Sequence, residues 1–192
     1  HIAFDGWSSE IFIREVLCHY RYFESMAAGD YPQANEYRLP PLTFQYKDYA
    51  AWQRKRLSGE FIEQQSAYWL ERLADFETLN LPTDYVRPPQ ITYCGDDVIL
   101  PLDGQLDADL RRLAQQQGVT LYSVLLSAYY LLLSAYSHQN DIVVGTPIAN
   151  RDNQHTADLI GFFANTLALR QRIDKSLDLE RFIKTVATAV KE

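Results

Sequence analysis

Basic residues are a minority in this sequence. Its 192 residues hold 18 Lys and Arg against 25 Asp and Glu, for a formal net charge of -7 at pH 7. Nucleic acids and anionic lipids are bound through clustered basic side chains. The composition therefore argues against a nucleic-acid partner and against binding to a membrane surface.

Cysteine and metal-binding patterns are also scarce. The two cysteines, Cys18 and Cys94, lack the spacing of a metal site, and the sequence has no secretory signal segment. Reduced thiols in the cytoplasm are then the expected state. His19, His138 and His155 have no metal-ligand spacing either, so we expect no metal site.

Several catalytic motifs are absent. The sequence has no G-x-S-x-G elbow, P-loop, paired C-x-x-C, H-E-x-x-H or dinucleotide fingerprint. Each of these motifs carries the chemistry of a particular enzyme class. Their absence argues against many hydrolases, NTPases, zinc enzymes and dehydrogenases.

No apolar run is long enough to be read as a membrane span. The most apolar stretch, residues 121–137, contains no charged residue, but it includes four serines and four tyrosines. A spanning helix needs roughly 20 mostly apolar residues. We therefore predict a buried central helix, with Thr120 as its N-cap.

The order of the predicted elements favours the α/β class. Hydrophobic periodicity and capping signals predict helices over residues 8–28, 44–57, 61–74, 107–117 and 121–137, and from Leu177 onward. Strands are predicted at 2–4, 98–102, 141–149 and around 159–170. Such alternation indicates two covered layers, shared between two lobes. The three prolines of residues 81–89 mark the candidate lobe boundary.

The first predicted helix follows a turn that can display chemistry. An imidazole, His1, stands four residues before Asp5-Gly6, at the expected end of a buried strand, where functional groups are often displayed. Ser8 is the expected N-cap of this helix. Its expected buried stripe consists of Phe12, Val16, Tyr20 and Phe23.

Three motifs resemble those of one known family. His1 to Ser8 is similar to the latter part of the H-H-x-x-x-D-G-W-S motif of condensation domains in nonribosomal peptide synthetases. Residues 46–52, Y-K-D-Y-A-A-W, resemble the family motif Y-x-D-Y-A-x-W. Residues 160–170, I-G-F-F-A-N-T-L-A-L-R, resemble I-G-x-F-V-N-T with its downstream Arg, and differ from it by Ala164 in place of Val.

The resemblance implies a two-lobed fold of the chloramphenicol acetyltransferase type. The chain starts without Met and stops inside a predicted helix, so we expect an internal fragment of a longer protein. Residues 1–90 would form the C-terminal part of the N-lobe, and 91–192 the first part of the C-lobe. The isolated fragment is expected to be inactive.

The reaction implied by the resemblance is amide formation. An amino acid amine on one carrier protein would attack the thioester carbonyl of an acyl or peptidyl group on another. The resemblance assigns His1, Asp5 and Gly6 to the catalytic motif. His1 would act as a general base or as a positioning group, Asp5 would hold the loop by pairing with an Arg upstream of this segment, and Gly6 would leave room beside the imidazole.

Other residues receive binding or structural roles from the same resemblance. Ser8, Asn165 and Thr166 are the candidate substrate-binding residues, because an amide or hydroxyl beside the crevice could hydrogen-bond a substrate carbonyl. Structural roles are expected for the remaining motif residues, Trp7, Tyr46, Asp48, Trp52 and Arg170.

No cofactor of its own is implied. Substrates would arrive as phosphopantetheinyl thioesters on upstream and downstream peptidyl carrier proteins, with an adenylation domain adjacent in the same chain. Two alternatives stay open. One is a related acyltransferase that forms an ester or loads an acyl starter, and the other is a non-catalytic recruitment domain of the same fold.

Overall fold

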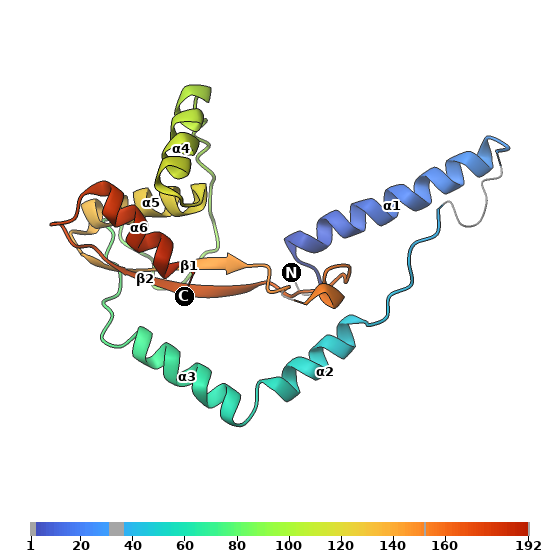
Figure 1. The fold of residues 1–192 in the computed structure, drawn as a ribbon, viewed down its shortest axis with the longest axis horizontal. Coiled ribbons are helices and arrows are strands. Elements are labelled where there is room, and N and C mark those ends of the chain that lie inside the picture. Colours follow the sequence, from blue (N-terminus) through green and yellow to red (C-terminus); the bar gives the residue numbers. More distant parts are fainter. Residues whose placement is uncertain (1–2, 31–36, 152, 192) are drawn as a thin grey trace. The chain divides into compact units, whose positions relative to one another are not determined.

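The structure is a computed structural model that describes residues 3–30, 37–151 and 153–191 (Figure 1). Its elements, in chain order, are α1 (Gly6–Ala27), α2 (Tyr46–Arg56), α3 (Glu60–Arg72), α4 (Gly104–Gln117), α5 (Leu121–Ser137), β1 (Asp141–Ile148), the short 3-10 helix η1 (Gln154–Thr156), β2 (Asn165–Arg172) and α6 (Leu179–Ala189). His1 and Ile2 lie outside the described residues, and Ala3 and Phe4, the rest of the strand predicted at residues 2–4, form no strand.

The chain divides into two compact units. One unit combines His1–Glu71 with Thr146–Leu167, and the other combines Arg72–Gly145 with Ala168–Glu192. Both strands pass from one unit into the other. The predicted lobe division near residue 90 concerns the whole domain and stays a prediction.

The second unit contains the larger apolar core. Its buried members come from α5, β1, α6 and the residue after β2, and they are Leu126, Tyr130, Leu133, Ile142, Ile173, Phe182 and Val186. The Tyr130 hydroxyl donates to the Leu169 carbonyl at 2.9 Å. Burial raises the pKa of Tyr130 to about 12, so this phenol stays protonated as a donor. The core therefore ties the central helix α5 to strand β2.

The two strands form a single hydrogen-bonded pair. The Ile173 amide donates to the Asn140 carbonyl at 2.7 Å. Since this bond joins the residue before β1 to the residue after β2, the strands run antiparallel. The prediction of two strands here is confirmed, but Ile142 is the only buried residue of β1, so the expected cover on both faces is absent from the described part of the chain.

Helix α5 confirms the sequence prediction at both ends. It spans residues 121–137, and the Thr120 hydroxyl accepts from the Ser123 amide. Helix α4 ends as predicted at Gly118, which has a φ of 65° in the left-handed region. Its start lies three residues before the predicted one, because Asp103 caps the helix by accepting from the Leu106 amide.

Two predictions, the buried stripe of α1 and the strand at 98–102, are wrong for the described residues. The expected stripe of α1 is exposed, from 47% for Val16 to 65% for Phe23. Residues 98–102 form no strand, and their apolar side chains are exposed. Periodicity identifies an apolar face or a strand-like run, but it does not supply the element that covers or pairs with it.

Among the described residues, no single helix meets the length and hydropathy of a membrane span. Helices α4 and α5 together have that length and hydropathy, but the pair is bent by 105°.

Candidate functional site

Asp5 is the N-cap of α1. Its Oδ1 accepts from the Ser8 amide at 2.9 Å, and its backbone is extended, with φ -120° and ψ 174°. The prediction that Ser8 caps this helix is wrong, because the helix begins two residues before Ser8, at Gly6, and Asp5 is the residue that caps it. Asp5 is 3% exposed, so it is fixed at the point where the His1 motif turns into the helix.

Arg151 is the charge partner of Asp5. Its Nη2 lies 3.0 Å from Asp5 Oδ1 and 3.3 Å from Oδ2, and its side chain is 2% exposed. The expected partner upstream of the segment is therefore corrected to a residue just after β1. A buried carboxylate needs a buried cation or several donors, and here the chain itself supplies the cation.

The other nitrogens of Arg151 organise the loop that follows it. Nη1 donates to the carbonyls of Thr156 at 2.6 Å and Leu159 at 2.8 Å. The carbon at the centre of the guanidinium lies 4.0 Å from the centre of the Phe163 ring. Nε is buried and has no hydrogen-bond partner among the described residues; the aromatic ring beside the guanidinium offers it only a weak acceptor.

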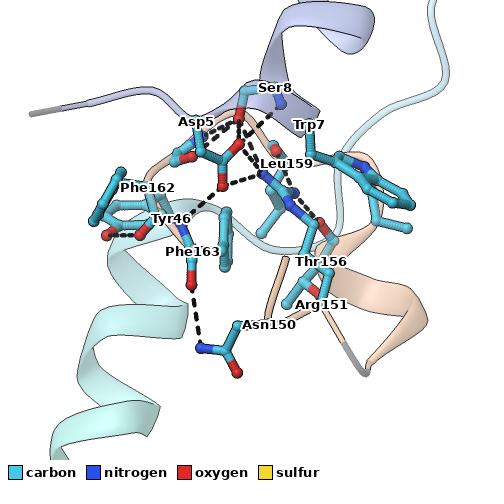
Figure 2. Close-up of polar contacts among 12 residues, drawn as sticks. Asp5, Trp7, Ser8, Tyr46, Asn150, Arg151, Thr156, Leu159, Phe162 and Phe163 are labelled. Atoms are coloured by element: carbon cyan, nitrogen blue, oxygen red, sulfur yellow. Dashed lines mark hydrogen bonds and ion pairs between the residues drawn. The ribbon is translucent and has the colours of Figure 1, made fainter. Parts of the chain in front are cut away.

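Ser8 links the helix to the loop before β2. Its hydroxyl is fully buried, lies 2.7 Å from Asp5 Oδ1 and 2.9 Å from the Gly161 carbonyl, and can donate its one proton to either. It also accepts from Arg151 Nη2 at 2.9 Å and from the Gly161 amide at 3.1 Å. Figure 2 shows these bonds meeting at the Ser8 hydroxyl and the Asp5 carboxylate. A direct contact of Ser8 with substrate would require it to leave this network.

The electrostatics keep Asp5 ionised. Burial alone would raise its pKa, but hydrogen bonds from Ser8, from the Phe163 amide and from Arg151 outweigh burial and lower the pKa to about 2. Both carboxylate oxygens are occupied by these donors. Asp5 is thus a fixed anion at neutral pH, unsuited to exchange a proton with a substrate.

Gly161 permits the close approach of the second motif. A Cβ at this position would lie 2.2 Å from Cδ2 of Tyr46. The Tyr46 hydroxyl donates to the Phe162 carbonyl at 2.8 Å, and its ring packs edge-on against Phe163, with centroids 5.2 Å apart. Residues from all three predicted motifs thus meet within the first unit, next to the Asp5–Arg151 pair.

The remaining motif residues have varied surroundings. Asp48 accepts from the Gln45 amide at 2.9 Å and so caps the start of α2. The Trp52 ring lies 5.2 Å from the Arg56 guanidinium. The indole N–H of Trp7 donates to the Ala157 carbonyl at 3.0 Å. A Cβ on Gly6 would meet no described atom within 4 Å. The prediction that Gly6 leaves room beside the imidazole concerns His1, which lies outside the described residues.

The candidate substrate-binding residues Asn165 and Thr166 open β2 and are exposed. Asn165 Oδ1 accepts from the Thr166 amide at 2.8 Å. This bond uses the side-chain oxygen of Asn165, and the NH₂ group is the donor of that side chain. The binding roles assigned to both residues stay predictions.

Arg170 belongs to a second ion pair, in the second unit. Its Nε and Nη2 bind the two oxygens of Asp141 at 2.8 and 2.6 Å. Its Nη1 donates to the carbonyls of Arg72, at 3.1 Å, and Ala74, at 2.6 Å. Two segments far apart in sequence are thus tied to β2, and the structural role assigned to Arg170 stays a prediction.

Sequence reasoning missed two residues of the site. Arg151 falls in a predicted polar loop, and so does Asn150, whose amide donates to the Phe163 carbonyl at 3.2 Å. One signal was available: a buried Asp needs a cation, and Arg151 is the second residue after the predicted strand 141–149. No group of His, Cys, Asp or Glu within the described ranges could hold a metal ion.

Comparison with known proteins gives consistent matches. A family model described as the condensation domain matches residues 1–192. One of the linear gramicidin synthase proteins of Brevibacillus parabrevis is 47% identical over 171 residues, which are 88% of this chain and 3% of that protein. Malpibaldin synthetase from Mortierella alpina is 42% identical over 187 residues, which are 97% of this chain and 3% of that protein. The chain thus spans only a small part of these relatives.

Solved structures share the α/β fold. The structure of the X-domain in complex with OxyB, from teicoplanin biosynthesis, is 27% identical, with a TM-score of 0.81, over 99% of this chain and 41% of that chain. A four-domain nonribosomal peptide synthetase, crystallised with AMP and glycine, gives a TM-score of 0.77 at 23% identity, over 98% of this chain and 13% of that chain. The predicted fold class is confirmed.

Proposed function

This chain belongs to the condensation domain family, and from that premise we propose that it forms amide bonds in nonribosomal peptide synthesis. The donor is an acyl or peptidyl thioester on one carrier protein. The acceptor is an aminoacyl group on a second carrier protein. The protein is accordingly an acyltransferase.

One observation carries this proposal: Asp5 is a buried, fully hydrogen-bonded anion at the N-cap of α1. Because it cannot exchange a proton near neutral pH, Asp5 holds the turn and leaves proton transfer to another group of the motif. His1, four residues earlier, is the remaining group of this motif with a side chain of the kind that commonly transfers protons in enzymes.

The reaction balances without a covalent enzyme intermediate. The neutral acceptor amine attacks the thioester carbonyl, a C–N bond forms, and the C–S bond breaks. The amine proton passes to the departing pantetheine thiolate, either through His1 or directly when His1 only positions the amine. The buried and engaged Ser8 hydroxyl is unsuited to act as a nucleophile, which supports direct transfer.

The partners follow from this chemistry. No cofactor of the protein's own is needed, since both substrates are carried as phosphopantetheinyl thioesters. The proposed partners are the upstream and downstream peptidyl carrier proteins, with an adenylation domain in the same chain. Asn165 and Thr166 would hydrogen-bond a substrate carbonyl.

A second candidate function is protein recruitment without catalysis. It is favoured by the similarity to the X-domain, a domain solved in complex with another protein, OxyB. The two proposals differ in their expectation for His1→Ala: recruitment would be unaffected, whereas amide formation would not. An acyltransferase that makes esters or loads an acyl starter differs from both in its acceptor.

The test uses the intact protein and a pair of loaded carrier proteins, with the condensed thioester product followed by mass spectrometry. Wild type, His1→Ala and Asp5→Asn are compared after each is shown to be folded. Loss of a positioned base is expected to lower the rate by about 100-fold or more. If wild type forms no amide but transfers the acyl group to a hydroxyl, the ester alternative holds. If no transfer occurs with any carrier pair, recruitment holds.

A further inference from the structure

We propose that Trp7 is a positioning residue for the Asp5–Arg151 pair, and that it acts through its indole N–H on the loop carrying the carbonyl acceptors of Arg151. The indole donates to Ala157 at 3.0 Å. The Trp7 ring also lies 5.9 Å from the Arg151 guanidinium. Only the kinetic part of this inference rests on the proposed function.

The Ala157 carbonyl, which accepts from Trp7, lies in the same loop segment as the carbonyls that accept from Arg151. Ala157 follows directly after Thr156, whose carbonyl accepts from Arg151 Nη1. Leu159, two residues further on, provides the second acceptor, and its amide donates to the Thr156 carbonyl at 3.3 Å. Trp7 and Arg151 therefore hold three carbonyls within one four-residue segment.

These bonds form a closed circuit of contacts: the chain and hydrogen bonds lead from the Asp5-Gly6 turn through Trp7, the loop and Arg151 back to Asp5. From Asp5 the chain reaches Trp7 in two residues, and the indole reaches Ala157. The neighbouring carbonyl of Thr156 accepts a hydrogen bond from Arg151, and Arg151 in turn donates to Asp5. Figure 2 shows Trp7 and Arg151 approaching the same segment. Loss of the indole bond would let this segment move and change the direction in which Arg151 meets the carboxylate.

A second tryptophan offers a matched control. Trp52 is 50% exposed and Trp7 is 49% exposed, so the two rings bury similar fractions of their surfaces. In the described part of the chain, no hydrogen bond from the Trp52 indole is formed; its ring instead stacks with Tyr49 and with Arg56. Replacement of Trp52 by Phe removes an indole without removing a bond to the loop.

The first test does not need activity. In the intact protein, hydrogen exchange is measured at the amides of Gly161 and Phe163, which donate to Ser8 and Asp5. Three variants are compared with wild type: Trp7→Phe, Trp52→Phe, and Trp7 replaced by β-(3-benzothienyl)alanine, which keeps the ring but has sulfur in place of N–H. Loss of one hydrogen bond predicts about 2- to 10-fold faster exchange in both position-7 variants and no change in Trp52→Phe.

The second test separates positioning from general stability. In the carrier-protein assay, both position-7 variants are expected to lower kcat about 2- to 10-fold with KM for each carrier unchanged, while Trp52→Phe keeps the wild-type values. Unchanged exchange in the benzothienyl variant, or an equal effect in Trp52→Phe, overturns the inference. An unchanged kcat despite faster exchange overturns the positioning role. If wild type forms no product, the proposed function fails, while the exchange experiment still tests the circuit.

Discussion

Two of the Arg–Asp pairs in the described residues, Arg151–Asp5 and Arg170–Asp141, differ in how the carboxylate is held. In the first unit, one nitrogen of Arg151 serves both oxygens of Asp5, and the remaining donors come from Ser8 and the backbone. In the second unit, two nitrogens of Arg170 donate to the two oxygens of Asp141, one to each. Asp5 is 3% exposed, whereas the Asp141 side chain is 23% exposed and has Arg172 as a second partner.

The Asp5–Arg151 pair is therefore part of a larger hydrogen-bond network, whereas the Asp141–Arg170 pair connects neighbouring segments of the second unit. In the Asp5 network, both carboxylate oxygens accept hydrogen bonds, and the turn before α1 is joined to the loop before β2, so each member depends on the others. Asp141 keeps solvent and a second cation within reach if Arg170 is removed. In both carboxylates the pKa is lowered; for Asp141 the largest cause is the hydrogen bond from Arg170, whereas for Asp5 several donors overcome burial.

Removal of the arginines should expose the difference most strongly. Arg151→Met removes the only cation paired with buried Asp5 among the described residues and takes one donor from each of two loop carbonyls, and we expect it to lower the free energy of unfolding by about 3–5 kcal/mol. Arg170→Met should cost less, since Arg172 and water still reach Asp141. Urea unfolding of the intact protein measures both variants. Equal losses would show that the two pairs are equivalent.

Gly161 provides the next largest effect. Gly161→Ala places a methyl group 2.2 Å from the Tyr46 ring, so the ring must leave Phe162 and Phe163. Overpacking of this kind costs about 3 kcal/mol at the upper end of its usual range. The control is Gly104→Ala at the start of α4, where a Cβ meets nothing within 4 Å. The same melting temperature for both variants would contradict the close approach of Tyr46 to Gly161.

Local signals allow part of the fold to be predicted. Helix α5 is correct at both ends because an uninterrupted apolar run and a Thr cap lie within the helix itself. Residues 98–102 are predicted as a strand on the same kind of local pattern, but a strand also needs a partner, and no described residues pair with them. The exposed stripe of α1 fails for the same reason.

The site can be predicted in its motifs and not in its contacts. The positions of Asp5, Tyr46 and Gly161 within recurring motifs can be read from the sequence. The partner of Asp5 cannot, because Arg151 lies 146 residues away, and its place soon after a predicted strand does not by itself identify it as the partner. Ser8 is mistaken for the cap because Ser and Asp are both favoured caps, and only the geometry decides between them.

Acid should weaken the first pair in a defined pH range. The pKa of Asp5 is about 2 in the folded protein, against an ordinary value of 3.8, so its contribution is complete above pH 3.8 and is lost as the pH falls toward 2. Linkage gives about 2 kcal/mol for this loss. The measurement is urea unfolding of wild type and Asp5→Asn between pH 6 and pH 2.5. The advantage of wild type should narrow only below pH 4; a constant difference down to pH 2.5 would contradict an ionised, hydrogen-bonded Asp5.

The smallest effect belongs to the outer partner of the second pair. Arg172 is 75% exposed and lies 3.3 Å from Asp141 Oδ2, so Arg172→Gln should lower the free energy of unfolding by about 0.5 kcal/mol, and by less in 0.5 M salt, because exposed ion pairs are weak and screened. The double variant with Arg170→Met measures what Arg172 supplies when it is the sole cation left. If Asp141 tolerates the loss of Arg170 because Arg172 replaces it, the double variant will lose more than the sum of the two single variants. Additive losses would mean that water alone compensates Asp141, and the second pair would then differ from the first only in its exposure.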